Sequence, residues 1–189
     1  LGADWRVVNL ATSGSKTSNL VTRRDTALGW PDLKLTGDNV MAFEIGRNDI
    51  SASGGETPAS HYANVVDYLT DDFGTVPESI LAKGWDLRVM VNIASSPNYS
   101  TAIEAYRLLL RDPAFAVDTG TDASGAYPGR MQLIDTDLIT DGGQTIFATT
   151  DDAADQTYYA GDSTHPGILG AALRATGGDD PTKGIANGL

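Results

Sequence analysis

Short apolar runs alternate along the chain with stretches of helical spacing. The apolar runs cover residues 6–10, 40–45, 87–93 and 131–135, and each is brief and mostly apolar. Such runs are typical of strands that are covered on both faces. Between them, apolar residues recur at the spacing of one helical face: Tyr62, Val65, Val66 and Leu69, and then Ile103, Tyr106 and Leu110.

This alternation predicts an α/β fold. Parallel strands need connections of about helix length, so the order predicts a three-layer α/β/α arrangement around a parallel sheet. In such sheets ligands bind beyond the carboxyl ends of the strands. We therefore expect the loops after residues 10, 45 and 93 to share one rim.

The chain is long enough for one sizeable core. We predict one domain over residues 1–175, followed by a tail or linker over residues 176–189, where Gly and Asp replace the apolar pattern. Residues 118–129 have no periodicity and are rich in small polar residues, which predicts a surface excursion.

Composition excludes several classes of function. A net charge of −12 would repel a phosphate backbone, so nucleic acid is not expected as a partner. The chain has no Cys, which removes disulfides, thiolate nucleophiles and cysteine-based zinc sites. No apolar run is long enough for a transmembrane helix. The pattern fits a soluble protein, is compatible with secretion, and leaves the compartment open.

The segment that carries the most chemistry is Asp162-Ser163-Thr164-His165, ahead of an apolar helix-like run. An Asp three residues before a His can fold its carboxylate onto the imidazole and fix its tautomer, as in the base half of a serine triad. The plain alternative is an exposed loop without a partner. The other histidine, His61, is interpreted as a capping or surface residue.

Two further polar clusters follow predicted strands. Asn48, in Gly46-Arg47-Asn48-Asp49, and Gly14, in Ser13-Gly14-Ser15, could supply a side-chain amide and a backbone N–H to a developing oxyanion. Taken alone, the Asn48 cluster is better explained by an ordinary Asx turn, and a plain turn explains the Gly14 cluster at least as well. Arg47 is interpreted as a member of a surface ion pair rather than as a substrate contact.

Taken together and in this order, these motifs resemble the SGNH (GDSL-like) hydrolase family. Its Ser-Gly block is matched at Ser13-Gly14, its Gly-X-Asn-Asp block at residues 46–49, and its Asp-X-X-His-Pro block at residues 162–166. Tyr158-Tyr159 is also typical of the family. The resemblance implies a flavodoxin-like sheet, a catalytic Asp162 and His165, an oxyanion hole at Gly14 and Asn48, and no cofactor or metal.

The chain departs from the family in one respect. The block that holds the nucleophilic serine, Gly-Asp-Ser after the first strand, has no match before Gly14, and Gly161-Asp162-Ser163 is interpreted as coincidence. The resemblance then implies that an upstream segment or second polypeptide supplies the serine and the first strand. That strand would separate residues 6–10 from residues 40–45 by about 9–10 Å.

The sequence therefore favours a carboxylic-ester hydrolase that acts through an acyl-serine on a small ester, an acylated sugar or a lipid. This chain alone is expected to be inactive without the nucleophile. The alternative is a carbohydrate-binding or structural module that keeps the fold and has lost catalysis.

Overall fold

The computed structural model describes residues 9, 11–12, 14–20, 39–50, 55–70, 80–94 and 100–188. The strand predicted over residues 6–10 lies outside the described residues except for Asn9. Its expected separation from residues 40–45 lies outside them as well.

The centre of the molecule is a parallel sheet of three strands, as the apolar runs predict. It is formed by β1 (Val40–Phe43), β2 (Asp86–Met90) and β3 (Met131–Ile134), in the order β1-β2-β3. Both pairings are parallel, with Phe43 opposite Val89 and Val89 opposite Leu133. The sequence order of neighbouring strands is thus also their order in space.

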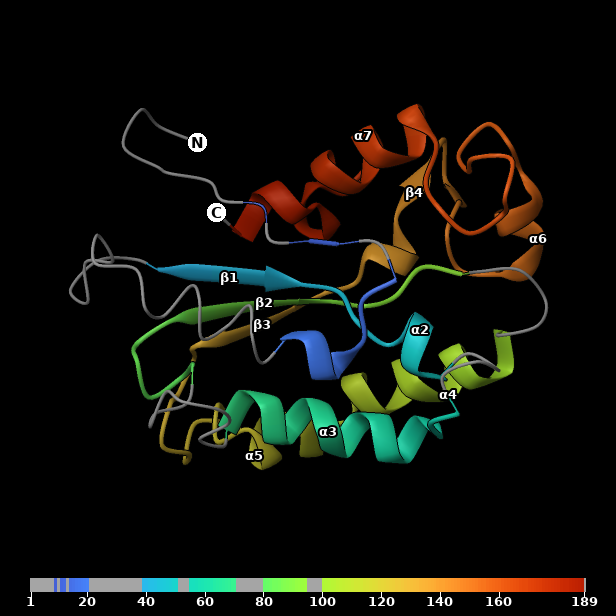
Figure 1. Cartoon of the computed structure of the whole chain (residues 1–189). Helices are drawn as coiled ribbons and strands as arrows, with labels where there is room; N and C mark the ends of the chain where they lie inside the picture. The colour runs from blue at the N-terminus through green and yellow to red at the C-terminus, as the bar shows by residue number, and fades with distance from the viewer. Residues whose placement is uncertain are drawn as a thin grey trace.

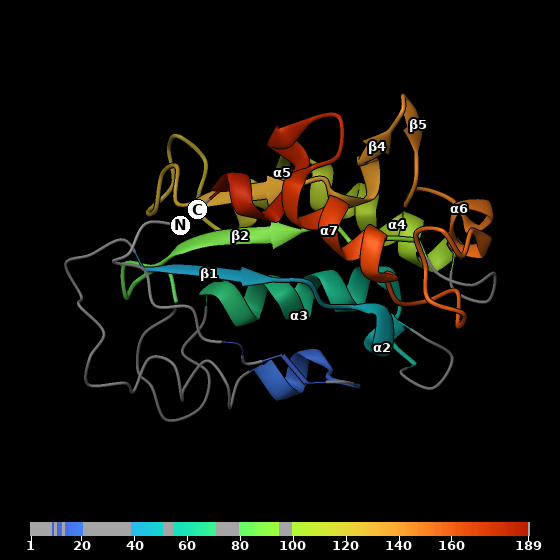
Figure 2. The same ribbon diagram turned by 90° about the horizontal axis from the view of Figure 1, so that it is seen from above.

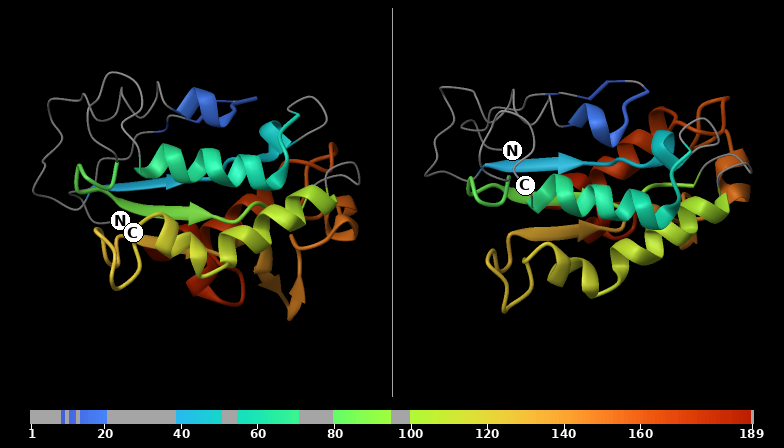
Figure 3. Two further views of the ribbon diagram at one scale, coloured as in Figure 1. Left: turned by 90° about the horizontal axis from the view of Figure 1, so that it is seen from below. Right: turned by 60° about the horizontal axis from the view of Figure 1, so that its bottom comes forward.

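Helices lie on both faces of this sheet. On one face are α3 (Pro58–Thr70), α4 (Ser100–Arg111) and α5 (Ala114–Asp118), which Figure 1 shows below the strands and Figure 3 shows from their own side. On the other face lies α7 (Ile168–Thr176), which crosses above the strands in Figure 2. The predicted α/β class is confirmed in this coarse form.

The apolar faces of β2, α3 and α4 make the main core. Leu87 and Val89 of β2 pack against Val65 and Leu69 of α3, and each of the four is at most 1% exposed. The buried apolar residues of α4 repeat at helical spacing: Ile103, Tyr106 and Leu110. Burial of this kind contributes about 25 cal/mol per Å² of apolar surface, so it is the main term that holds the layers together.

A second, smaller core lies beyond the carboxyl end of β2. Phe147 and Tyr159 are its largest buried members, and their rings meet edge to face with centroids 5.6 Å apart. This core joins the residues after β2 to the chain that leads towards His165.

The shorter elements surround that second core. They are η2 (Thr136–Leu138), the hairpin of β4 (Thr140–Asp141) and β5 (Gln144–Thr145), and α6 (Thr150–Ala154). Gly142 and Gly143 turn the hairpin with φ of 58° and 81°, backbone conformations that favour glycine.

Residues 177–188, predicted to be a tail or linker, fold back on the domain. They form the 3-10 helices η3 (Pro181–Lys183) and η4 (Ile185–Gly188), which contact α7. The carboxylate of Asp179 also accepts hydrogen bonds from the N–H groups of Gly142 and Gly143. Within the described part of the chain, none of the helices has the length and apolarity that crossing a bilayer requires.

Candidate functional site

The predicted pair of Asp162 and His165 forms a closed hydrogen-bonded loop just before α7. Asp162 Oδ1 accepts the backbone N–H groups of Thr164 at 2.9 Å and His165 at 3.0 Å, while Asp162 Oδ2 lies 2.6 Å from His165 Nδ1. The predicted hydrogen bond between the two side chains is therefore confirmed. Because Nδ1 faces the carboxylate, the other ring nitrogen, Nε2, is directed away from Asp162.

Local hydrogen bonds lower the pKa of Asp162. The backbone N–H of His165, the His165 side chain and the Thr164 N–H all favour the ionised carboxylate. Both side chains are open to solvent, with His165 66% and Asp162 50% exposed. The loop thus holds a charged carboxylate against an accessible imidazole.

The backbone around this loop is held by its own pairing. The N–H of Ala160 donates to His165 O at 2.8 Å, and the N–H of Gly167 donates to Tyr158 O at 2.7 Å. Ser163 takes φ of 52°, which is uncommon for a residue other than glycine. The Tyr159 hydroxyl donates to Ala94 O at 2.9 Å, so the loop is anchored to the residues after β2.

Arg47 links the loop to the ends of two strands. Its guanidinium donates to the backbone oxygens of Thr164, in the His165 loop, and Ile93, beyond β2. The interpretation of Arg47 as a surface ion pair is wrong: burial lowers its pKa, and its contacts are with main-chain carbonyls. The short helix α2 (Arg47–Ile50) carries Arg47 and places Asn48 beside it.

Glu44 makes a second link that the sequence interpretation did not identify. Its carboxylate pairs with Arg174 of α7, and its other oxygen accepts the backbone N–H of Ile93 at 3.4 Å. Both side chains of the pair are mostly buried, with Arg174 12% and Glu44 20% exposed. A charged residue at the end of the apolar run over residues 40–45 was the available signal, because such a charge is rarely buried without a partner.

The loops of Gly14 and Asn48 are also neighbours. Asn48 Nδ2 donates to Ser15 O at 3.0 Å, and Gly14, in the same loop as Ser15, takes φ of 74°. The three motif-bearing loops are therefore joined by hydrogen bonds: Ser15 to Asn48, and Arg47 to Thr164. Figure 1 shows α2 at the end to which the strand arrowheads point. Ser15 and Ile93 are both hydrogen-bonded to α2, so the expected shared rim is confirmed for the described residues of these loops.

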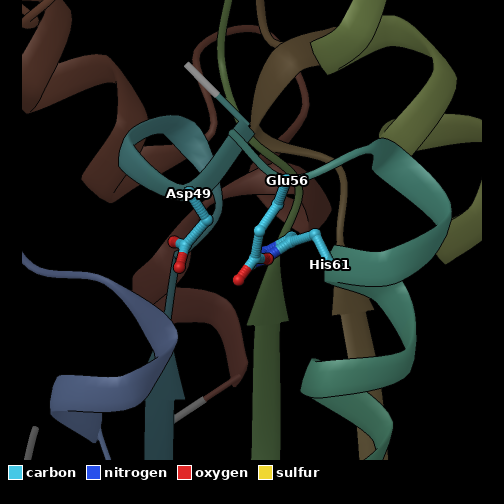
Figure 4. Close-up of side chains that lie close together, drawn as sticks. All are labelled: Asp49, Glu56 and His61. Atoms are coloured by element: carbon cyan, nitrogen blue, oxygen red, sulfur yellow. The ribbon is translucent and has the colours of Figure 1, made fainter. Parts of the chain in front are cut away.

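The other histidine differs from its prediction. His61 is not a surface residue: it is 0% exposed, and its Nδ1 lies 3.0 Å from Glu56 Oε2. Asp49, Glu56 and His61 each offer a potential metal ligand, and these atoms all lie within 4.8 Å of one another (Figure 4). The missed signal was helical spacing, because His61 stands four residues before the buried Val65.

Comparison with models of protein families, with curated proteins and with solved structures gave no match.

Proposed function

We propose that this chain is the greater part of an SGNH-type serine esterase, in which Asp162 and His165 are the acid and base of the triad. The observation that carries the proposal is the 2.6 Å contact between His165 Nδ1 and Asp162 Oδ2. A second set of contacts supports it. Asn48 donates to Ser15 O, next to Gly14, and Arg47 donates to Thr164 O, next to His165.

The proposal gives each group a step. A neutral His165 donates Nδ1–H to Asp162 and keeps the lone pair on Nε2 for a proton. As a serine oxygen bonds to the ester carbonyl carbon, its proton passes to Nε2, and Asp162 stabilises the imidazolium. Nε2 then protonates the leaving alcohol. Water repeats the sequence on the acyl-serine and releases the acid.

The oxyanion that forms in each half-reaction needs positioned donors. Gly14 N–H and the Asn48 amide are proposed for this role. The hydrogen bond from Asn48 Nδ2 to Ser15 O orients the amide beside the loop that carries Gly14. Arg47 positions the site, because it holds the His165 loop close to Asn48 through Thr164 O.

The serine itself is proposed to come from an upstream segment or second polypeptide, because no Gly-Asp-Ser block follows a strand before Gly14 in the sequence. The order β1-β2-β3 is compatible with one half of a flavodoxin-like sheet. In that arrangement the missing strand would pair with the other edge of β1 and carry the serine at its carboxyl end.

Hydrolysis of 4-nitrophenyl acetate tests the proposal. The 189-residue chain should not turn the ester over, whereas a version extended by the segment encoded directly upstream should. In the extended version, His165→Ala should lower kcat by about 10⁴-fold or more. Ser163→Ala is the matched control in the same loop, and it should leave kcat within about twofold because Ser163 is given no catalytic role.

Turnover by the unextended chain that His165→Ala abolishes would refute the need for an outside serine. The lack of a Gly-Asp-Ser block before Gly14 favours one other function, a carbohydrate-binding or structural module on the same fold. An extended protein that binds a polysaccharide but hydrolyses no ester would establish that alternative.

A further inference from the structure

A compact polar cluster lies behind the rim, between α2 and α3. Asp49 of α2, Glu56 in the connection and His61 of α3 turn their side chains towards one another (Figure 4). One ligand atom from each lies within 4.8 Å of the other two. The cluster shares no residue with the Asp162–His165 pair.

Each carboxylate has one oxygen that a separate donor orients. The backbone N–H of Thr17 donates to Asp49 Oδ1 at 2.9 Å, and the Asn64 amide donates to Glu56 Oε1 at 3.1 Å. The second oxygen of Glu56, Oε2, is the one that lies 3.0 Å from His61 Nδ1. Outer donors that fix one carboxylate oxygen while the other faces inward are typical of metal sites.

Two members of the cluster, Asp49 and His61, are buried, and Glu56 is partly exposed. Asp49 is 2% exposed, and its Oδ2 has no hydrogen-bond partner. In the part of the chain that the structure describes, neither Asp49 nor Glu56 forms an ion pair with Lys or Arg, and Glu56 pairs only with His61. Buried ionised groups are costly unless they are paired or coordinate a metal, so two carboxylates beside one imidazole leave a charge that a divalent cation would neutralise.

We propose that Asp49, Glu56 and His61 bind one divalent transition-metal ion of the Zn²⁺ type. A nitrogen and two carboxylate oxygens are a zinc ligand set, with bonds of about 2.0–2.2 Å, whereas Ca²⁺ and Mg²⁺ prefer oxygen alone. The 3.0 Å from Nδ1 to Oε2 already matches two ligands on one ion. Thr17 Oγ1 lies 3.4 Å from the same Nδ1 and is a potential fourth ligand.

Such an ion would have a structural role. It would tie α2, which carries Asn48, to the start of α3, and Thr17 would bring in the helical turn over residues 17–20. The Glu56 side chain is 29% exposed, which gives the ion a path from solvent. Because Asp162 and His165 take no part, the metal site stands or fails separately from the proposed esterase.

Isothermal titration of the chelator-treated 189-residue chain with Zn²⁺ is the test. We expect one site per chain and a higher thermal midpoint with the metal, since an ion that binds only the folded state stabilises it. Glu56→Gln and His61→Gln should each weaken Zn²⁺ binding by at least about tenfold, the loss that follows removal of even an outer-shell partner. His165→Gln, which removes the other histidine, should leave the affinity unchanged.

Far-UV circular dichroism checks that each variant folds. Glu56→Gln decides the matter if His61→Gln does not fold, because Glu56 is partly exposed and Gln has nearly the same shape. Absorbance of bound Co²⁺ in the visible range, present in the wild type and lost in Glu56→Gln, gives a second readout. No saturable binding of Zn²⁺, or Zn²⁺ binding that Glu56→Gln leaves intact and His165→Gln removes, would overturn the proposal. The cluster would then be a buried ion pair only.

Discussion

The two histidines of this chain each face a carboxylate, in opposite surroundings. His165 lies 2.6 Å from Asp162 with its side chain 66% exposed, whereas His61 lies 3.0 Å from Glu56 with its side chain 0% exposed. Exposed pairs contribute little to stability, and buried groups must be satisfied or they cost free energy. Under the two proposals, the same two residue types have different tasks: proton transfer at the exposed pair, and metal binding at the buried one.

The largest expected difference is between the free energies of unfolding of the two histidine-to-alanine variants. His61→Ala opens a cavity under Gly46 and Tyr106, and we expect it to lower the free energy of unfolding by about 2–4 kcal/mol. His165→Ala should change it by less than about 0.5 kcal/mol, because its side chain faces solvent. Urea denaturation of both variants in chelator measures the difference. Equal losses would contradict the contrast between the sites.

Substitution of two glycines should give a smaller difference in stability between the two regions. Gly46 takes φ of 126°, and a Cβ there would lie 2.8 Å from His61 Nε2, whereas one at Gly14, with φ of 74°, would meet nothing within 4 Å. Gly46→Ala should therefore destabilise the fold by about 2–3 kcal/mol and Gly14→Ala by about 1 kcal/mol. The same denaturation assay tests this, and a larger loss at Gly14 would argue against tight packing around His61.

The smallest expected effect is on the acid side of the pH profile. Hydrogen bonds lower the pKa of Asp162 in the folded chain, so its ionised form stabilises the fold above the ordinary value of about 3.9. That contribution is lost as the pH falls below about 4. Asp162→Asn should remove this part of the pH dependence. Urea midpoints between about pH 2 and pH 7 should show a shallower acid fall in the variant, and parallel curves would contradict it.

The sequence was sufficient for the parts of the fold that depend on apolar periodicity. The runs over residues 40–45 and 131–135 contain β1 and β3, the run over residues 87–93 covers all of β2 except Asp86, and helical spacing located α3 and α4. The predicted and observed strand ends differ. β2 stops at Met90, three residues before the end of its apolar run, because the residues after it pack against Phe147 and Tyr159 in the second core. The Asp-Gly-Gly turn of the β4–β5 hairpin was visible in the sequence, but strands of two residues give no periodic signal.

Strand ends predicted which loops share the rim, but individual contacts of the candidate site were predictable only where the groups are close in sequence. Asp162 and His165 stand three residues apart, so local geometry alone brings them together. The contacts of Arg47 with Thr164, and of Glu44 with Arg174, join residues more than a hundred positions apart. No spacing rule predicts such contacts, because they depend on how the helices pack across the sheet.

Covalent labelling with a fluorophosphonate tests the central claim most directly, because the reagent reacts with a serine that a neighbouring base has activated. The protein extended by its upstream segment is treated with the reagent and mapped by peptide mass spectrometry. The account predicts one labelled serine outside residues 1–189, with labelling slowed by about 10³-fold or more in His165→Ala. A label on a serine within residues 1–189, or labelling that His165→Ala leaves unchanged, would contradict it.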